Sequence, residues 1–125
     1  MYPYSVNKVE AASDSGTYRL EFDSREMIRN ICLDIKNGRD RSLIAADFMN
    51  TLVDMATCIC IMIREKTDLK RVVLSGGTFQ NMYLLEHVTL ALEGKGFKVF
   101  RHSRVASNDE GICLGQAAIA AQICQ

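Results

Sequence analysis

The sequence predicts an α/β fold in which a short mixed sheet packs against helices, one of which is long and buried. Alternating apolar and polar residues near the N-terminus indicate two strands, residues 2–9 and 17–22, that form a hairpin. Residues 42–66 carry apolar side chains at helical spacing over an unusual length. Two short apolar runs, residues 71–74 and 97–100, enclose a helical segment, which is the order of a β-α-β unit with parallel strands.

The N-terminal elements have recognisable boundaries. Residues 13–16, Ser-Asp-Ser-Gly, have the chemistry of a turn between the two strands. Ser24 can cap a helix that runs from Arg25 to about Lys36, and Asn37-Gly38 is its stop signal. The long helix that follows is apolar around most of its circumference in its C-terminal half, which predicts a central and largely buried position.

The C-terminal half alternates strands and helices. The run at residues 71–74 is typical of a strand covered on both faces. A helix over residues 80–92 ends at glycines, and a last helix over about residues 110–123 is rich in small residues that permit close packing. Asn108 or Asp109 can cap this last helix.

Length and composition restrict the class of protein. A chain of 125 residues has enough surface to bury for one core, which predicts a single domain over residues 1–125. Fifteen basic and fifteen acidic side chains cancel, so a nucleic-acid partner is not expected. We find no apolar run of about 18 residues that would span a membrane, and we expect a cytoplasmic protein. The cysteines form no C-x-x-C pair, which favours reduced and buried thiols, at positions Cys32, Cys58, Cys60, Cys113 and Cys124.

Two segments could carry chemistry. The first, Ser75-Gly76-Gly77-Thr78-Phe79-Gln80-Asn81, joins a strand to a helix and lets backbone N–H groups approach a phosphate or a nucleotide. The same Gly-Gly pair also serves the sterics of an ordinary turn, and Thr78, Gln80 and Asn81 could be capping groups. The second segment, residues 107–111, also follows a strand. Because ligands bind at the carboxyl ends of parallel strands, both segments could face one crevice.

The other polar candidates either have two interpretations or do not indicate a functional site. Asp109 could ligate a metal ion or orient a nucleotide hydroxyl, but an aspartate at this position is more often simply a helix cap. His87 and His102 have no partner at helical spacing and do not indicate a metal site. Cys58 and Cys60 lie two residues apart in the long helix, where their side chains diverge and cannot grip one ion.

These segments resemble the C-terminal part of the HypF carbamoyltransferases. The resemblance rests on residues 72–81, VVLSGGTFQN, and on residues 108–117, NDEGICLGQA, and it extends to Tyr2-Pro3-Tyr4 and to residues 44–48. It implies the C-terminal lobe of an actin-like ATPase and sugar-kinase fold, of the ribonuclease H-like type. Met49 and Glu110 depart from a histidine and a glycine that are frequent in relatives.

The resemblance also implies an activity and its ligands. HypF proteins use carbamoyl phosphate and ATP to make carbamoyl adenylate, and they transfer the carbamoyl group to the C-terminal cysteine of HypE during [NiFe] hydrogenase maturation. It implies nucleotide binding by Ser75, Gly76, Gly77, Phe79, Gln80, Asn81 and Asn108. In relatives an aspartate at the position of Asp109 binds a divalent metal, Zn, Fe or Mg, together with histidines from an earlier subdomain.

Two functional hypotheses remain open from the sequence. In the first, the chain supplies the adenine-nucleotide side of an active site that also needs the upstream HypF domains, so the chain alone is inactive. In the second, it is a stand-alone, non-catalytic domain that oligomerises, for example as a homodimer, or binds a partner through an exposed apolar face.

Overall fold

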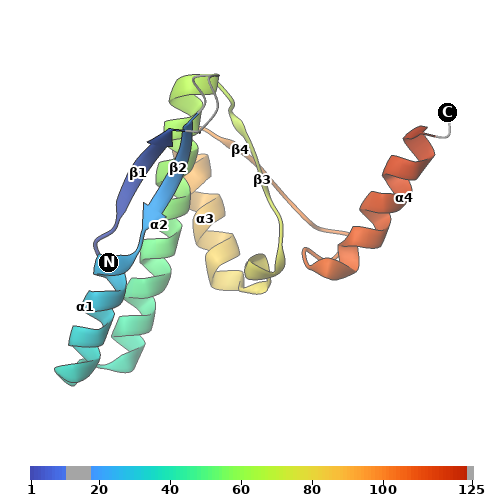
Figure 1. Cartoon of the computed structure of the whole chain (residues 1–125). Coiled ribbons are helices and arrows are strands. Elements are labelled where there is room, and N and C mark those ends of the chain that lie inside the picture. Colours follow the sequence, from blue (N-terminus) through green and yellow to red (C-terminus); the bar gives the residue numbers. More distant parts are fainter. Residues whose placement is uncertain (11–17, 124–125) are drawn as a thin grey trace. The chain divides into compact units, whose positions relative to one another are not determined.

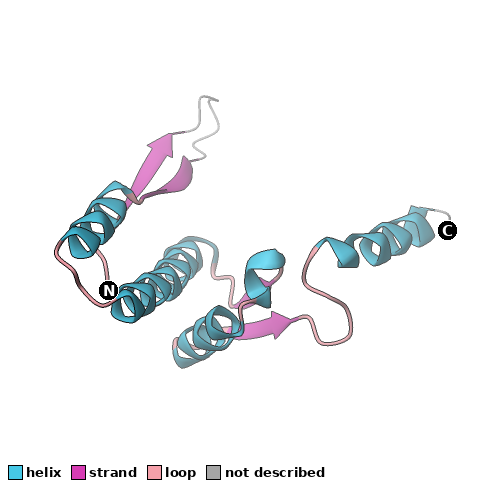
Figure 2. Ribbon diagram, turned by 90° about the horizontal axis from the view of Figure 1, so that it is seen from below, coloured by secondary structure: helices cyan, strands magenta, loops and turns pink. Residues whose placement is uncertain are grey.

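The computed structural model describes residues 1–10 and 18–123 (Figure 1). The chain divides into two compact units, residues 1–55 and residues 56–125. The α/β class is confirmed, with one long helix. Strands of both relative directions are present, but they form two separate two-stranded sheets (Figure 2). The single domain over residues 1–125 stays a prediction.

The first unit begins with a β-hairpin. Strands β1 (Ser5–Glu10) and β2 (Tyr18–Asp23) pair antiparallel, with Ser5 opposite Asp23, as the alternating pattern predicts. The predicted turn at residues 13–16 lies outside the described residues. Tyr4 and Phe22 pack edge to face with ring centroids 5.9 Å apart, a favourable aromatic geometry between the segment before β1 and the strand β2.

Helix α1 (Arg25–Lys36) has the predicted bounds and ends before Gly38, whose φ of +72° suits glycine. The predicted cap by Ser24 is wrong, because its side chain makes no capping hydrogen bond. Asp23 takes this role instead. Its Oδ1 accepts the Arg25 backbone N–H at 3.0 Å, and its carboxylate also binds the Arg25 guanidinium. The side-chain hydrogen bond from Arg25 lowers the pKa of Asp23 to about 2.

The core of this unit joins the N-terminal residues to both helices. Tyr2, Met27 and Ile44 are buried together, and Ile31 and Phe48 pack against them. Burial, together with the hydrogen bond that the Tyr2 hydroxyl donates to Asp34, raises the pKa of Tyr2. The Tyr2 backbone N–H donates at 2.7 Å to Oγ1 of Thr51, a side chain with no exposed surface.

An ionic network lies beside this core. The Arg39 guanidinium donates to Asp34 Oδ2 at 2.6 Å and to Asp47 Oδ2 at 2.7 Å, bridging α1 and the next helix. Hydrogen bonding to Arg39 lowers the pKa of Asp34. The pKa of Asp47 is lowered first by the Met1 ammonium group and then by Arg39. Both carboxylates are therefore held in their ionised form.

Helix α2 (Arg41–Thr67) confirms the predicted long helix, with Asp40 accepting the Ser42 N–H at 2.8 Å before its first turn. The expectation that it is largely buried is wrong: most of its side chains are half-buried, and 17% of its most apolar 18-residue window is buried. A helix that packs against few neighbouring elements buries only one of its sides, even where apolar side chains surround most of its axis.

Helix α2 also corrects the expectation that no segment is long and apolar enough to cross a membrane. It meets that description by length and composition, which core helices of soluble proteins also do. Two carboxylates along it have polar partners: Asp47 binds the Met1 ammonium group at 2.8 Å, and Asp54 accepts the Tyr4 hydroxyl at 2.6 Å. Charged groups are costly inside a bilayer. These contacts favour a helix of a water-soluble fold.

The second unit contains the predicted β-α-β order. Strands β3 (Arg71–Leu74) and β4 (Lys98–Arg101) pair in parallel, and helix α3 (Met82–Gly94) connects them after a short 3-10 helix η1 (Gly77–Gln80) (Figures 1 and 2). The buried apolar side chains of this unit, among the described residues, are Leu74, Leu84, Val88, Leu92 and Phe97. The prediction that β3 is covered on both faces is wrong, because Val73 is 68% exposed while Leu74 is buried.

The chain ends with a 3-10 helix η2 (Asp109–Gly111) and helix α4 (Ile112–Ile123). The predicted helix is therefore present, but its side chains are exposed along its length, so the close packing expected from its small residues is not seen.

The expectation of buried cysteines is also wrong in part. Cys32 and Cys113 are exposed, Cys58 and Cys60 are half-buried, and these four are free thiols. Cys124 lies outside the described residues.

Candidate nucleotide-binding site

The loop after β3 is shaped by one glycine. Gly76 has φ of 104° and ψ of 161°, a conformation that side chains with a Cβ rarely adopt. It turns the chain away from the strand so that η1 begins at Gly77. A Cβ atom at either Gly76 or Gly77 would meet nothing within 4 Å. The glycines therefore leave this stretch of backbone bare toward open space, where a flat ligand could contact it.

Main-chain and side-chain hydrogen bonds join this loop to the one after β4. The Gly76 N–H donates to the Ser107 carbonyl oxygen at 2.8 Å. Ser75 Oγ lies 2.9 Å from His102 Nε2. Because β3 and β4 are parallel, both loops leave from the carboxyl ends of their strands. The two segments are therefore adjacent in space, while a shared crevice and nucleotide binding by their residues stay predictions.

The two asparagines of the predicted site have capping roles. Asn81 Oδ1 accepts the Leu84 N–H at 3.3 Å at the start of α3. Asn108 Oδ1 accepts the Glu110 N–H at 3.2 Å at the start of η2. Of the two capping candidates for the last helix, the structure therefore selects Asn108. These bonds orient both side chains and fix where each helix begins.

A small pocket of about 150 Å³ lies at the carboxyl ends of the two strands. Ligand sites for drug-sized molecules have volumes of ~300–1,000 Å³, so this pocket fits only part of a nucleotide. Phe79 is the one predicted site residue among its walls. The lining side chains are Leu74, Phe79, Leu85, Arg101, His102, Val105 and Ser107.

Sequence reasoning assigned no role at this site to two polar residues of the pocket, Arg101 and His102, whereas Ser107 belongs to the second predicted segment. The parallel register pairs Leu74 with Arg101, so the next residues along the two strands are Ser75 and His102. Aligning the last residues of the two predicted strands, Leu74 and Phe100, would have placed Ser75 beside Arg101, so the pairing of Ser75 with His102 is known only from the structure. His102 lies directly after Arg101, the last residue of β4.

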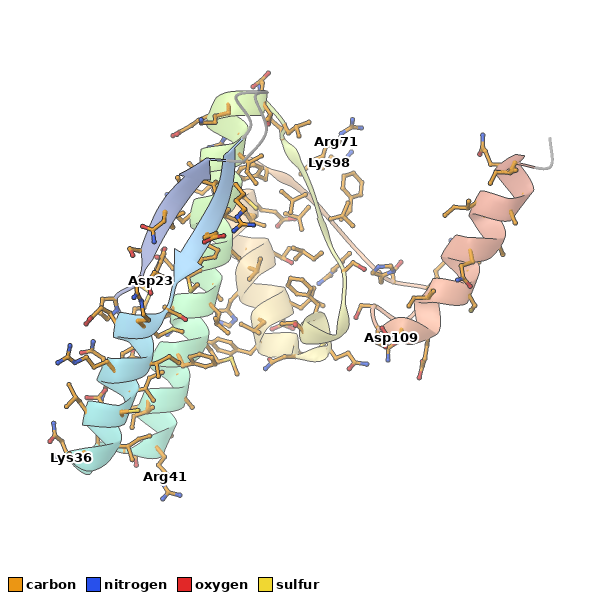
Figure 3. All side chains as sticks on the ribbon, in the orientation of Figure 1. Asp23, Lys36, Arg41, Arg71, Lys98 and Asp109 are labelled. Atoms are coloured by element: carbon orange, nitrogen blue, oxygen red, sulfur yellow. The ribbon has the colours of Figure 1, made fainter. Side chains whose placement is uncertain are left out.

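Asp109 is exposed at the first residue of η2, labelled in Figure 3 beside the beginning of α4. Within residues 1–10 and 18–123, no group of three or more His, Cys, Asp or Glu side chains could hold a metal ion. A divalent cation takes several oxygen or nitrogen ligands from its surroundings. One exposed carboxylate does not make such a site, so these residues alone do not fit a bound metal. Gln80 is exposed on the first loop.

The remaining candidates are accounted for by local structure. His87 Nδ1 lies 2.9 Å from the Tyr83 carbonyl oxygen, and its ring stacks on Tyr83 with centroids 3.8 Å apart. Burial raises the pKa of the Cys60 thiol, which disfavours the reactive thiolate. Neither residue lines the pocket at the strand ends.

Three comparisons relate the chain to known proteins. A family model described as "Carbamoyltransferase, Kae1-like Domain, second subdomain" matches residues 2–116. The chain is 33% identical to the carbamoyltransferase HypF of Synechocystis sp. over 115 residues, 92% of this chain and 13% of that protein. It is 33% identical to a tRNA N6-adenosine threonylcarbamoyltransferase of Herminiimonas arsenicoxydans over 88 residues, 70% of this chain and 24% of that protein.

Among solved structures, the chain is similar to full-length HypF crystallised in a phosphate- and nucleotide-bound form. The TM-score is 0.83 and the sequence identity is 37%, over 97% of this chain and 15% of that protein. The likeness therefore extends over nearly the whole chain, while the chain spans a small part of each relative.

Proposed function

Since the chain belongs to the HypF carbamoyltransferase family, as the second subdomain of the Kae1-like domain, we propose that it supplies the adenine-nucleotide side of a carbamoyltransferase active site. The reaction proposed for the complete enzyme consumes carbamoyl phosphate and ATP and forms carbamoyl adenylate. The carbamoyl group then passes to the C-terminal cysteine of HypE, in the maturation of [NiFe] hydrogenases.

One observation carries this proposal. Two loops at the carboxyl ends of parallel strands are tied together by the Gly76–Ser107 and Ser75–His102 hydrogen bonds. Open α/β sheets bind nucleotides at such an edge. A site that is held in place before the ligand arrives loses less entropy on binding than a mobile one.

Each predicted residue has a part in this proposal. The bare backbone of Gly76 and Gly77 contacts the ribose or base, and Phe79 supplies an apolar wall. Asn81 and Asn108 fix the first turns that follow the two loops. Ser75 and Gln80 offer polar groups at the exposed rim.

The chain contributes only part of the chemistry. Adenylate formation needs the two phosphate-bearing substrates and a metal held in one geometry. Asp109 would contribute one carboxylate to a divalent metal, Zn, Fe or Mg, whose other ligands come from the upstream HypF domains. We therefore expect no turnover by this chain alone. We propose that the complete enzyme acts in the cytoplasm.

A second function is favoured by one specific observation. Helix α4 exposes large apolar side chains, among them Leu114 at 55%, Ile119 at 62% and Ile123 at 77%. Apolar surface of this kind marks contact with another protein surface. A non-catalytic domain that forms a homodimer or binds a partner would use this helix, and it would not respond to nucleotide.

The test is an NMR titration of the isotope-labelled chain with ATP, up to millimolar concentration. We expect amide shifts confined to residues 75–81 and 107–111. The variant Gly77→Leu covers the bare backbone and should abolish the shifts. Gly94→Leu is its control: an added Cβ there also meets nothing within 4 Å, and Gly94 lies at the other end of α3. Absence of shifts in the unaltered chain, with a concentration-dependent increase in mass, would establish the second function.

A further inference from the structure

Ser75 and His102 occupy equivalent places in the second unit. Each follows the last residue of its strand, and the strand register continues into them, so their side chains meet on the same side of the parallel pair. The Ser75 Oγ to His102 Nε2 distance is 2.9 Å, a hydrogen bond of ordinary length. Both residues are exposed, and the bare loop begins at the next residue, Gly76.

We infer that His102 is a positioning residue of this site, which sets whether the Ser75 hydroxyl donates or accepts a hydrogen bond when a nucleotide binds. The inference rests on the proposed function, because it concerns how the same loop meets its ligand. His102 acts through Ser75 and need not touch the nucleotide itself.

The hydrogen bond between Ser75 and His102 can form in either direction, depending on which ring nitrogen carries a proton. A neutral imidazole with its proton on Nδ1 accepts at Nε2, so the Ser75 hydrogen is used by the histidine and only oxygen lone pairs face a ligand. An imidazole that carries a proton on Nε2 donates to Ser75 Oγ instead, and this frees the hydroxyl hydrogen. The protonated ring always has this second arrangement. Ser75 can then donate to a phosphate oxygen or to a ring nitrogen of the base.

One of the residues that line the pocket around His102 is charged. Arg101 lines the same pocket, and the other lining residues, from β3, η1, α3 and the loop after β4, carry no charge; they are Leu74, Phe79, Leu85, Val105 and Ser107. Arg104 follows two residues after His102 in its own segment. An anionic ligand at this edge therefore meets Arg101 and a histidine that gains a positive charge as the pH falls. Protonation of His102 and binding of a phosphate-bearing nucleotide then favour each other.

The experiment measures the dissociation constant of ATP by NMR between about pH 5 and 8, the range in which histidine changes charge. The variants are Ser75→Ala, His102→Gln and the double variant, with His87→Gln as the matched control histidine. Glutamine keeps an amide near the position of Nε2 and does not titrate. The profile of His102→Gln also records the contribution of the nucleotide's own titrating phosphate.

We expect affinity in the unaltered chain to rise roughly five-fold as the pH falls across this range, the effect of one hydrogen bond. His87→Gln should keep this rise. Ser75→Ala and His102→Gln should each lose it, and the double variant should bind as weakly as either single one, because the two residues act as a unit.

Two results overturn the inference alone, and a third overturns both the inference and the proposed function. A pH profile in Ser75→Ala or His102→Gln equal to that of the unaltered chain excludes the role of the pair. Losses that add in the double variant show that the residues act independently. If the unaltered chain binds no ATP at any pH, the proposed function fails and the inference fails with it. Amide spectra outside the two loops verify that each variant is folded.

Discussion

The backbone N–H of Gly76 donates a hydrogen bond of 2.8 Å to the carbonyl oxygen of Ser107. The bond joins the loop after β3 to the loop after β4 without using any side chain, so it does not depend on residue type at either position except through backbone conformation. That conformation is the vulnerable point, because Gly76 has a φ of +104°.

Gly76→Ala should therefore destabilise the fold by about 1–3 kcal/mol, the usual cost of a backbone region that is open essentially only to glycine. The cause would be the backbone, since a Cβ at this position meets nothing within 4 Å. Gly77→Ala is the control, because its Cβ also meets open space and its φ is not positive. Chemical denaturation followed by circular dichroism compares the two. Equal stability of both variants would contradict the argument.

Gly111 and Gly115 form a second matched pair. A Cβ at Gly111 would lie 2.7 Å from the Ala106 carbonyl oxygen, closer than such atoms approach, so Gly111→Ala should displace the turn of η2. Gly115 lies within α4 and has open space around it. Gly115→Ala should stabilise α4 by ~0.5–1 kcal/mol, through the smaller entropy loss of alanine. Hydrogen exchange of the amides from residue 106 onward distinguishes the two effects, which should have opposite signs.

Thr51 is the polar residue to test in the first unit. Its Oγ1 accepts the buried Tyr2 N–H at 2.7 Å and donates to the Asp47 carbonyl oxygen at 2.7 Å. Thr51→Val keeps the shape and leaves the Tyr2 N–H without its acceptor, which should cost about 1–3 kcal/mol in urea denaturation. Thr51→Ser keeps the hydroxyl and loses one methyl group, at about 1 kcal/mol. A valine variant as stable as the serine variant would show that this hydrogen bond contributes little.

The Asp23–Arg25 ion pair predicts that the stability of the fold depends on pH in the acid range. The folded-state pKa of Asp23 is about 2, below the ordinary value of 3.8, so the pair stabilises the fold above about pH 4 and loses this contribution as the pH falls toward 2. Arg25→Gln should raise the Asp23 pKa toward its ordinary value, measured by carboxyl NMR. Arg29→Gln is the control, since Arg29 pairs with Glu26 at 3.9 Å, and it should leave the Asp23 titration unchanged. An unchanged pKa in Arg25→Gln would refute the assignment.

The predictable part of the fold is the part that local rules govern. Apolar spacing placed α1 on its observed bounds, and Gly38 stops it with a positive φ. The side chain that caps α1 was misassigned, because Ser24 and Asp23 are both of a type that caps helices. The contact with the Arg25 guanidinium selects Asp23. Two good local candidates cannot be separated without the contacts of their neighbours.

The two loops of the candidate site were predicted from local signals. Gly76, Gly77, Asn81 and Asn108 were singled out because glycine and asparagine at strand–helix junctions have a local signature, and nucleotide binding by them stays a prediction. His102 was not found, because a histidine after a strand has no such signature until the register of the sheet pairs it with Ser75.

By itself, the sequence determined the order and type of the elements, the parallel β-α-β unit, the two loops and the family, since each depends on residues that are near one another along the chain. Only the tertiary structure decided which groups meet across the sheet, as Gly76 does with Ser107, and which apolar side chains remain exposed, as Val73 and Ile119 do. The physical reason is that periodicity reports the face a side chain is on, whereas burial and hydrogen-bond partners depend on what else in the protein packs against that face.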